Sequence, residues 1–452
     1  MISCILAYNS RLWILLKKSI PLTGALMKTP LPLPLVAHLR SITWPRHETF
    51  EKLPFVIAMA NGTLPLESYL GQLRGFAVIL STFEQTLAES RSALIGRLRP
   101  LLKSRFRMLC ADLSFFAPKM MPDIVPAIRL ALDFSRKIRS DAAASPDKLL
   151  GYLYVLEGTT RGNQVHLPDI VRCFNLEDEQ GVSFYRGYGE ATETHWEEFR
   201  SVMNDAGRET VSTAEQGAVE MYEALELFHR TLYPFAPEDL GITVSSLNPE
   251  AGDHPVPQNR EILQAAVKAG QRCHKEFSYY EKRYGERGRR FTESDVAWLA
   301  ALSDQPAEII SHQVLWLGRL LSSRGMPLML LERQLELLVE ELTDVPAAVS
   351  TEALRMSVAD MRLKRCAVIS PECYDEACRE LTAAILSTTL VNFPDLPTLL
   401  VASLVDARAG MPECKALLLT WLADTAILSE DELVRVRGIL DSLNRSPLEL
   451  QA

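Results

Sequence analysis

Residues 154–164 read YVLEGTTRGNQ, and residues 39–51 read LRSITWPRHETFE. In the first stretch Gly158 and Gly162 are four residues apart, so on a helix they share one face and leave it bare of side chains. Each glycine inside a helix costs about 1 kcal/mol relative to alanine. The pair therefore predicts either tight packing against another helix or close approach of the backbone to a ligand.

The second stretch carries one imidazole on a helix with apolar neighbours. His47 shares its helical face with Thr43, Phe50 and Glu51. A neutral imidazole is a common axial ligand of haem iron, and a nearby carboxylate fixes the tautomer and basicity of the ring. His47 is therefore a candidate iron ligand with Glu51 as its partner. The alternative is an ordinary core or surface histidine.

Helical periodicity dominates the chain. Apolar residues recur at steps of three and four from Leu66 to Leu87, which predicts a long helix that Pro65 can start. On this helix Gly71 and Gly75 can admit a close neighbour. Further helices are expected over 34–58, 94–109, 122–139, 145–173, 190–204 and 211–233. The sequence therefore predicts an all-α fold.

A run rich in helix breakers separates two helical halves. The segment from Tyr233 to Pro257 contains five prolines and two glycines, which makes it the best candidate linker. We therefore predict a flexible extension over 1–33, with Met27 as a candidate natural start, and a helical bundle over 34–235. A linker over 236–257 and a second all-α domain over 258–452 would follow.

Helix caps can be named in the second half. Thr292 with Asp295 and Ser429 with Glu432 have the spacing of capping boxes. Ser370 before Pro371 supplies an N-cap and a favourable first helical residue.

The composition narrows the function classes. The chain has 452 residues, 47% hydrophobic and 23% charged, which is close to the average of soluble globular proteins. Its net charge of −9 argues against nucleic acid as a partner, because that binding needs clustered Lys and Arg. The eight cysteines include no Cys-x-x-Cys pair, which favours thiols in a reducing cytoplasm. The apolar runs are too short for a membrane span.

Four stretches in order resemble the haem oxygenase family, particularly its bacterial, biliverdin-forming branch. They are LRSITWPRHETFE from Leu39, GTLPLESYLGQL from Gly62, YVLEGTTRGNQ from Tyr154 and FYRGYGEATETHWEEF from Phe184. The resemblance covers residues 34–235 and implies a haem held between a proximal helix bearing His47 and a kinked distal helix containing Gly158 and Gly162. It also implies that haem is both cofactor and substrate. With O2 and an external reductase or ferredoxin, the products would be biliverdin, carbon monoxide and ferrous iron.

The resemblance assigns further side chains to the haem pocket. Thr159 and Thr160 are candidates for anchoring water on the distal side, where Thr159 joins the two glycines at the catalytic face. Haem propionates are anionic, so Arg40 and Arg200 are candidates for binding them at the pocket mouth.

The sequence departs from the family pattern at three places. Asn163 follows Gly162 where many relatives have another glycine, so it adds a side chain near the haem face. Thr159 stands where vertebrate enzymes have a carboxylate. The long C-terminal half is foreign to the compact enzymes, and its task is open; it is a candidate site for a partner protein.

Two other functions compete with haem cleavage. In one, the first domain binds haem without turnover, as a sensor or carrier, and the second domain is its output. In the other, the bundle holds a diiron site, for which the sequence offers one Glu-x-x-His match, Glu226 to His229. For the remaining imidazoles, among them His166, His195 and His312, core or surface roles are expected.

Overall fold

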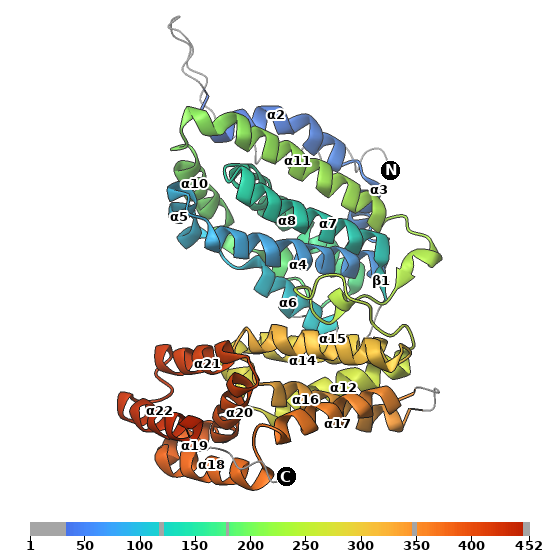
Figure 1. The fold of residues 1–452 in the computed structure, drawn as a ribbon. Helices are drawn as coiled ribbons and strands as arrows, with labels where there is room; N and C mark the ends of the chain where they lie inside the picture. Colours follow the sequence, from blue (N-terminus) through green and yellow to red (C-terminus); the bar gives the residue numbers. More distant parts are fainter. Residues whose placement is uncertain (1–32, 117–121, 178–179, 346–349, 446–452) are drawn as a thin grey trace, which may run out of the picture. The chain divides into compact units, whose positions relative to one another are not determined.

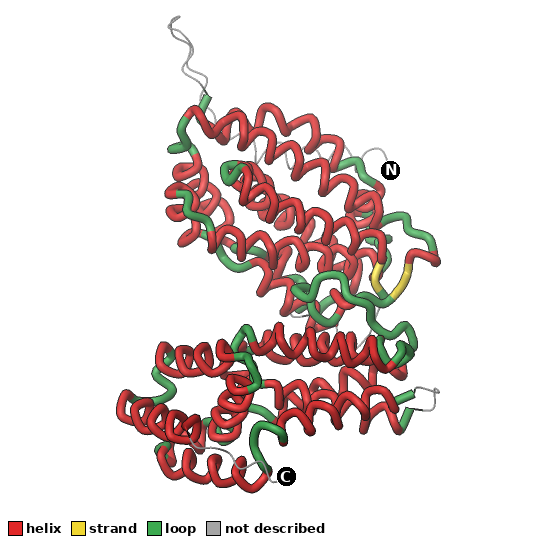
Figure 2. The backbone as a smooth tube through the Cα atoms, in the orientation of Figure 1, coloured by secondary structure: helices red, strands yellow, loops and turns green. Residues whose placement is uncertain are grey.

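The computed structural model describes residues 33–116, 122–177, 180–345 and 350–445. The chain divides into two compact units, Met1–Gly241 and Ile242–Ala452. Helices make up almost all of the regular structure in the described residues (Figure 2), and the predicted all-α fold is confirmed. Nearly all of the predicted extension, including Met27, lies outside the described residues. No described helix is both long enough and apolar enough to cross a membrane.

The first unit is a bundle of helices closed by a small strand pair (Figure 1). Its α-helices are α2 (Leu35–Phe50), α3 (Pro54–Ala60), α4 (Leu66–Glu89), α5 (Ala93–Leu98), α6 (Arg105–Phe116), α7 (Val125–Ala144), α8 (Lys148–Phe174), α9 (Ser183–Arg186), α10 (Thr192–Met203) and α11 (Arg208–Leu232). Short 3-10 turns are η1 (Arg99–Leu101), η3 (Gly189–Ala191) and η4 (Pro237–Asp239). Strand β1 (Asp123–Ile124) pairs antiparallel with β2 (Leu240–Gly241), so the end of the unit returns to the start of α7.

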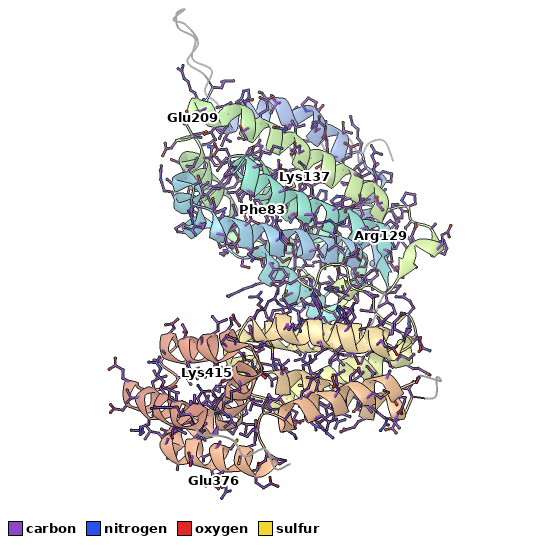
Figure 3. The ribbon with its side chains drawn as sticks, viewed as in Figure 1. Phe83, Arg129, Lys137, Glu209, Glu376 and Lys415 are labelled. Carbon is purple, nitrogen blue, oxygen red and sulfur yellow. The ribbon has the colours of Figure 1, made fainter. Side chains whose placement is uncertain are left out.

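Glycines allow α8 and α4 to approach α11 closely. A Cβ on Gly151 of α8 would lie 2.0 Å from the carbonyl oxygen of Ala214 on α11, a distance that no side chain tolerates. On α4, a Cβ on Gly75 would lie 2.3 Å from the Phe228 ring, and Gly71 faces α11 in the same way. The predicted close neighbour of Gly71 and Gly75 is therefore α11. Buried apolar residues such as Phe83 of α4 (Figure 3) complete the core.

Prolines divide two of the predicted helices. The expected helix over 34–58 ends at Phe50, and Pro54 begins α3 because proline has no N–H and suits a first helical position. The expected helix over 94–109 ends at Leu98, and η1 with Pro100 separates α5 from α6. The helices expected over 122–139, 145–173, 190–204 and 211–233 correspond to α7, α8, α10 and α11.

The second unit is a separate stack of helices. They are α12 (Arg260–Glu276), α13 (Tyr279–Tyr284), α14 (Glu286–Ala301), α15 (Ala307–Ser322), α16 (Leu328–Thr343), α17 (Glu352–Cys366), α18 (Pro371–Ala384), α19 (Ser387–Asn392), α20 (Leu396–Arg408), α21 (Pro412–Asp424) and α22 (Glu430–Arg445), preceded by the 3-10 turn η5 (Val244–Ser246). Helix α12 packs on α14 and α16, and α20 packs on α21. The division between the units falls inside the segment 236–257, whose Val244 and Val256 are buried in the second core.

The helix caps follow the sequence in two of three cases. The Ser370 side chain accepts a hydrogen bond from the Cys373 N–H, with Pro371 at the first helical position. Ser429 and Glu432 bond reciprocally, with the Ser429 N–H on Glu432 Oε2 at 2.9 Å. The third prediction is wrong, because Thr292 lies buried inside α14 and donates its hydroxyl to the Arg289 carbonyl. Helix α14 begins before Thr292, because packing of this segment in the core stabilises helix on both sides of the predicted cap.

We expect Glu432→Gln to destabilise the second unit. Burial alone would raise the pKa of Glu432, but hydrogen bonds from Ser429, Leu386 and Thr389 outweigh it and lower the pKa to about 2. A carboxylate with a depressed pKa stabilises the fold above its unfolded pKa of about 4.3, and this stabilisation is lost as pH falls toward 2. Urea unfolding at pH 7 should show a loss of about 1–3 kcal/mol.

That difference from the wild type should shrink as the pH approaches 2. Glu430→Gln, at an exposed position of the same helical turn, is the control and should unfold like the wild type. Equal unfolding of all three proteins at pH 7 would contradict this role of the capping box.

Candidate functional site

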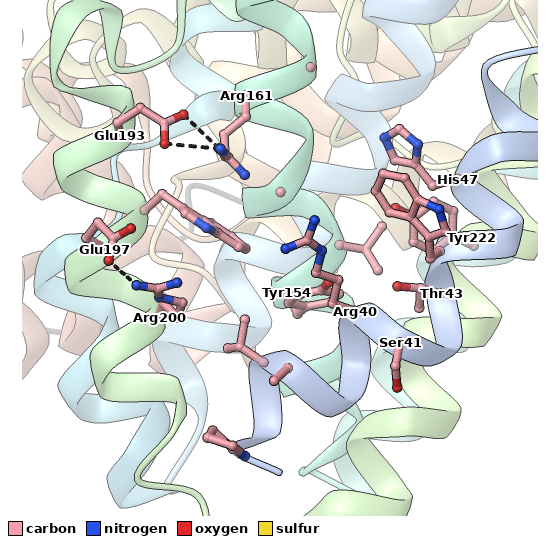
Figure 4. Close-up of a pocket in the computed structure, with 18 of the residues that line it drawn as sticks. Arg40, Ser41, Thr43, His47, Tyr154, Arg161, Glu193, Glu197, Arg200 and Tyr222 are labelled. Atoms are coloured by element: carbon pink, nitrogen blue, oxygen red, sulfur yellow. Dashed lines mark hydrogen bonds and ion pairs between the residues drawn. The ribbon is translucent and has the colours of Figure 1, made fainter. Parts of the chain in front are cut away.

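A cavity of about 1050 Å³ lies in the first unit, between α2 on one side and α8 and α10 on the other (Figure 4). Its volume is at the upper end of the range for small-molecule sites, roughly 300–1,000 Å³. Its lining comes mainly from four helices: Arg40, Trp44, His47 and Glu51 from α2, Tyr154, Gly158, Arg161, Gly162 and His166 from α8, Trp196 and Arg200 from α10, and Tyr222 from α11. The motif that starts at Gly62 lies on and before α4, which does not line this cavity.

His47 faces this cavity from α2. Its ring stacks in parallel on Trp44, with the ring centroids 5.3 Å apart. Its Nε2 lies 3.8 Å from Glu51 Oε1, which is too far for a hydrogen bond. Burial lowers the pKa of His47 below its ordinary value, so the imidazole is neutral at pH 7. The neutral ring is the form that coordinates a metal ion.

Glu51 lies near a second imidazole, that of His166 on α8. Glu51 Oε2 is 4.0 Å from His166 Nε2. Burial raises the pKa of Glu51 to about 7 and lowers that of His166 to about 4. The sequence analysis did not assign His166 to the site. The available signal was its position four residues after Gly162, which puts it on the helical face of the two glycines.

Gly158 and Gly162 face open space. No heavy atom of the described residues lies within 4 Å of a Cβ built on Gly162, and one on Gly158 would meet Trp196 at 4.0 Å. Gly151, on the same helix, would instead meet the α11 backbone at 2.0 Å. Helix packing therefore accounts for Gly151 but not for the other two glycines, and approach of the backbone to a ligand is the explanation that fits Gly158 and Gly162.

A smaller cavity of about 100 Å³ adjoins the large one. Both are lined by His47, Glu51, Gly158, Gly162, His166 and Tyr222. Thr159 lines the smaller cavity, where its hydroxyl donates to the Leu156 carbonyl at 2.7 Å and accepts from Arg105 at 3.1 Å. Asn163 also lines it, with its amide on the Phe184 carbonyl at 3.4 Å.

The structure corrects the prediction for Thr160. This side chain is fully buried, donates its hydroxyl to the Glu157 carbonyl at 2.6 Å and lines neither cavity. Glu157, which precedes Gly158, also turns away from the cavities. Its carboxylate accepts hydrogen bonds from the Tyr188 hydroxyl at 3.0 Å and from His195 Nε2 at 2.9 Å. These contacts anchor α8 to α10 and leave its cavity face without a carboxylate.

Three arginines line the large cavity. Arg40 lies over the Trp44 ring, 5.5 Å from its centroid. Arg200 is hydrogen-bonded to Glu197, so this predicted anion-binding residue already has an acidic partner. Arg161, which the sequence analysis missed, binds Glu193 through two hydrogen bonds of 2.7 and 3.1 Å. In Figure 4, Arg161 and Arg200 lie with their glutamates on one side, and His47 and Tyr222 lie on the other.

Glu226 and His229, the one Glu-x-x-His match, do not meet at a common site. Glu226 forms an ion pair with Arg230 at 2.8 Å. His229 is buried, and both of its ring nitrogens have hydrogen-bond partners. Among the described residues, no group of three or more His, Cys, Asp or Glu side chains is placed to hold a metal ion.

Comparison with known proteins identifies the class of this unit. Residues 33–232 match the family model described as Heme oxygenase. The resemblance to the haem oxygenase family is therefore confirmed for the N-terminal part of the chain.

The chain is also similar to solved structures whose names describe them as heme oxygenases. One from Leptospira interrogans is 20% identical with a TM-score of 0.39, over 44% of this chain and 99% of that one. Heme oxygenase-1 from Synechocystis sp. PCC 6803, in complex with heme, is 20% identical with a TM-score of 0.40, over 44% of this chain and 93% of that one. Heme oxygenase-2 from the same organism is 19% identical with a TM-score of 0.40, over 44% and 85% of the two chains. No curated protein matches the chain.

Two alanine substitutions on α8 should have opposite effects on stability. Gly151→Ala forces a Cβ against the α11 backbone, so the free energy of unfolding should fall by about 1–3 kcal/mol. Gly162→Ala adds helix propensity without a clash, so the ligand-free protein should gain about 0.5–1 kcal/mol. Denaturant unfolding of both variants measures the contrast. A loss at Gly162 as large as that at Gly151 would show that this face is packed against protein.

Proposed function

We propose that the first unit binds haem between α2 and α8, with His47 as the iron ligand, and cleaves it with O2 to biliverdin, carbon monoxide and ferrous iron. An external reductase or ferredoxin would supply the electrons. The observation that carries this proposal is the bare face of Gly158 and Gly162, which no helix of the described residues approaches closely and which lines the same cavity as the neutral imidazole of His47. The family match over residues 33–232 supports it.

The cavity residues fit an iron porphyrin. Aromatic and aliphatic side chains such as Trp44, Val155 and Trp196 offer apolar contact to the macrocycle. Of the three arginines, Arg40 lies over Trp44 and forms no ion pair with an acidic residue of the described part of the chain, which makes it the best candidate for a propionate. Arg200 and Arg161 would share their charge with Glu197 and Glu193.

The side chains around the cavity have separate tasks in this proposal. Bound haem supplies the iron at which O2 is activated and the ring carbon that is oxidised. His47 would hold the iron through its neutral imidazole, and its ring stacks on Trp44 in the same helix. Gly158 and Gly162 keep the opposite face open to a small molecule. Because Glu157 is turned toward His195, α8 places no carboxylate at that face.

The proposal also includes a cytoplasmic location and a role for the second unit. The seven cysteines of the described residues are all free thiols, which supports a reducing cytoplasm. We assign the second unit, whose core is its own, to binding a partner protein or to transmitting haem occupancy.

Hemin titration of His47→Ala tests the iron ligand. The wild type should develop a shifted Soret band at one hemin per chain. The variant should lose or alter that band and bind hemin at least tenfold more weakly, a difference of about 1.4 kcal/mol or more. His38→Ala is the matched control, because His38 lies on the same helix but pairs with Glu215 at 2.9 Å and does not line the cavity.

Turnover is measured separately, as biliverdin absorbance after haem, O2 and a reductase are added. A wild-type Soret band that persists in His47→Ala would contradict the assigned ligand. Haem binding without any pigment would contradict cleavage and leave a haem sensor or carrier.

A further inference from the structure

Three polar side chains from different helices meet at the wall of the smaller cavity. They are Gln72 of α4, Tyr185 of α9 and His229 of α11, with 6%, 1% and 2% of their surface exposed. Their neighbours are apolar, since the His229 ring packs edge-on against Phe50, Phe55 and Phe76. None of the three belongs to the proposed haem ligands. A buried polar group in such surroundings is costly unless its hydrogen bonds are satisfied.

The hydrogen bonds fix the orientation of the Gln72 amide. Tyr185 donates its hydroxyl to Gln72 Oε1 at 2.6 Å. Burial lowers the pKa of His229 to about 4, so the ring is neutral and carries one N–H. That N–H is on Nδ1, which donates to the Leu225 carbonyl at 2.7 Å. His229 Nε2 therefore accepts from the Gln72 amide nitrogen at 3.0 Å.

This arrangement uses one of the two N–H groups of Gln72. The described residues give the amide nitrogen no other hydrogen-bond acceptor, so its second N–H is available to a molecule inside the cavity. The cavity of about 100 Å³ has room for several water molecules, because a water molecule takes about 30 Å³ in the liquid. Water fits here better than an apolar guest, since Thr159, Asn163 and His166 also line the cavity.

On α8, two polar side chains near this cavity are already engaged. The Thr159 hydroxyl donates to the Leu156 carbonyl, and the Glu157 carboxylate is bound to Tyr188 and His195. Reduction of O2 during haem cleavage consumes protons, which must reach the face of the porphyrin turned toward Gly158 and Gly162. The cavity's other polar lining comes from Asn163 and His166 of α8, His47 and Glu51 of α2, Tyr222 of α11, and the Gln72, Tyr185 and His229 cluster.

We propose that Gln72, fixed by Tyr185 and His229, is a positioning residue that holds water in the smaller cavity for proton delivery to the haem face next to Gly158 and Gly162. This inference rests on the proposed haem site. Water held in the smaller cavity would relay protons from bulk solvent toward the cavity face of Gly158 and Gly162, taking up one proton for each that it passes on. The water is replenished through the large cavity, with which the smaller one shares its lining.

The test compares Gln72→Leu with Gln85→Leu in the full chain loaded with hemin. Gln85 is the matched control on α4, because it is exposed and binds Glu89 at 2.9 Å. Two readouts are needed. One is the pH midpoint of the ferric Soret change, which reports water at the iron. The other is the rate of haem consumption and its solvent deuterium isotope effect.

Other titratable groups also line the cavity walls and could shift the pH midpoint. They are His47 and Glu51 on α2, His166 on α8, Tyr185 on α9, and Tyr222 and His229 on α11. A second variant must therefore show that the shift comes from the Gln72 amide. Tyr185→Phe keeps the ring and releases Gln72 Oε1, so it should shift the midpoint in the same direction by a smaller amount. It is also the second variant if Gln72→Leu does not fold.

Gln72→Leu should bind hemin like the wild type, shift the spectral midpoint by at least half a pH unit and slow haem consumption by at least ~10-fold, within the range of proton-transfer catalysis. Its solvent isotope effect should rise. An unchanged midpoint, rate and isotope effect in folded Gln72→Leu would overturn the inference while leaving the haem site intact. A wild type that binds no hemin would overturn the proposed function and the inference together. Hemin binding without pigment would reject cleavage, and the midpoint would then decide whether Gln72 holds water.

Discussion

The described residues leave open space beside Gly158 and Gly162 on α8, where the nearest side chain is Trp196, and the site in the first unit depends on that constraint. The same helix uses glycine in two ways. Near its start, Gly151 lets α8 lie against the backbone of α11. About two to three turns further on, the face of Gly158 and Gly162 meets the cavity instead of a helix. Two glycines in a helix cost about 2 kcal/mol together relative to alanine. A ligand lying flat on this face would offset that cost. Without such a ligand, a better helix former than glycine would be expected at both positions.

The titratable groups of the cavity include two sets, imidazole and carboxyl groups whose pKa values are shifted by burial, and arginines that stay positively charged. The cavity interior carries imidazoles whose pKa values are lowered by burial, those of His47 and His166, and a carboxyl group, Glu51, whose pKa is raised to about 7. At pH 7 the two imidazoles are therefore neutral, and Glu51 is about half protonated. The permanent positive charges of the cavity are arginines, among them Arg40 and Arg161. A planar molecule with an apolar body and anionic substituents suits this distribution.

The sequence predicted the parts of this site that depend on local pattern. Helical periodicity and glycine spacing are local, so the predicted ranges of α8 and α10 agree with the observed bounds to within a few residues. The family resemblance directed attention to His47. The prediction failed where a distant neighbour decides the outcome: Thr292 matches a cap locally but lies inside a packed helix. Gln72 and His229 are 157 residues apart, and no spacing rule could pair them.

Iron anomalous scattering from crystals grown with hemin tests the central claim most directly, because it locates the metal independently of activity. The account predicts one strong peak in the first unit, at bonding distance from Nε2 of His47, with the porphyrin plane facing Gly158 and Gly162. A peak elsewhere, or a porphyrin that leaves the glycine face of α8 uncovered, would contradict it.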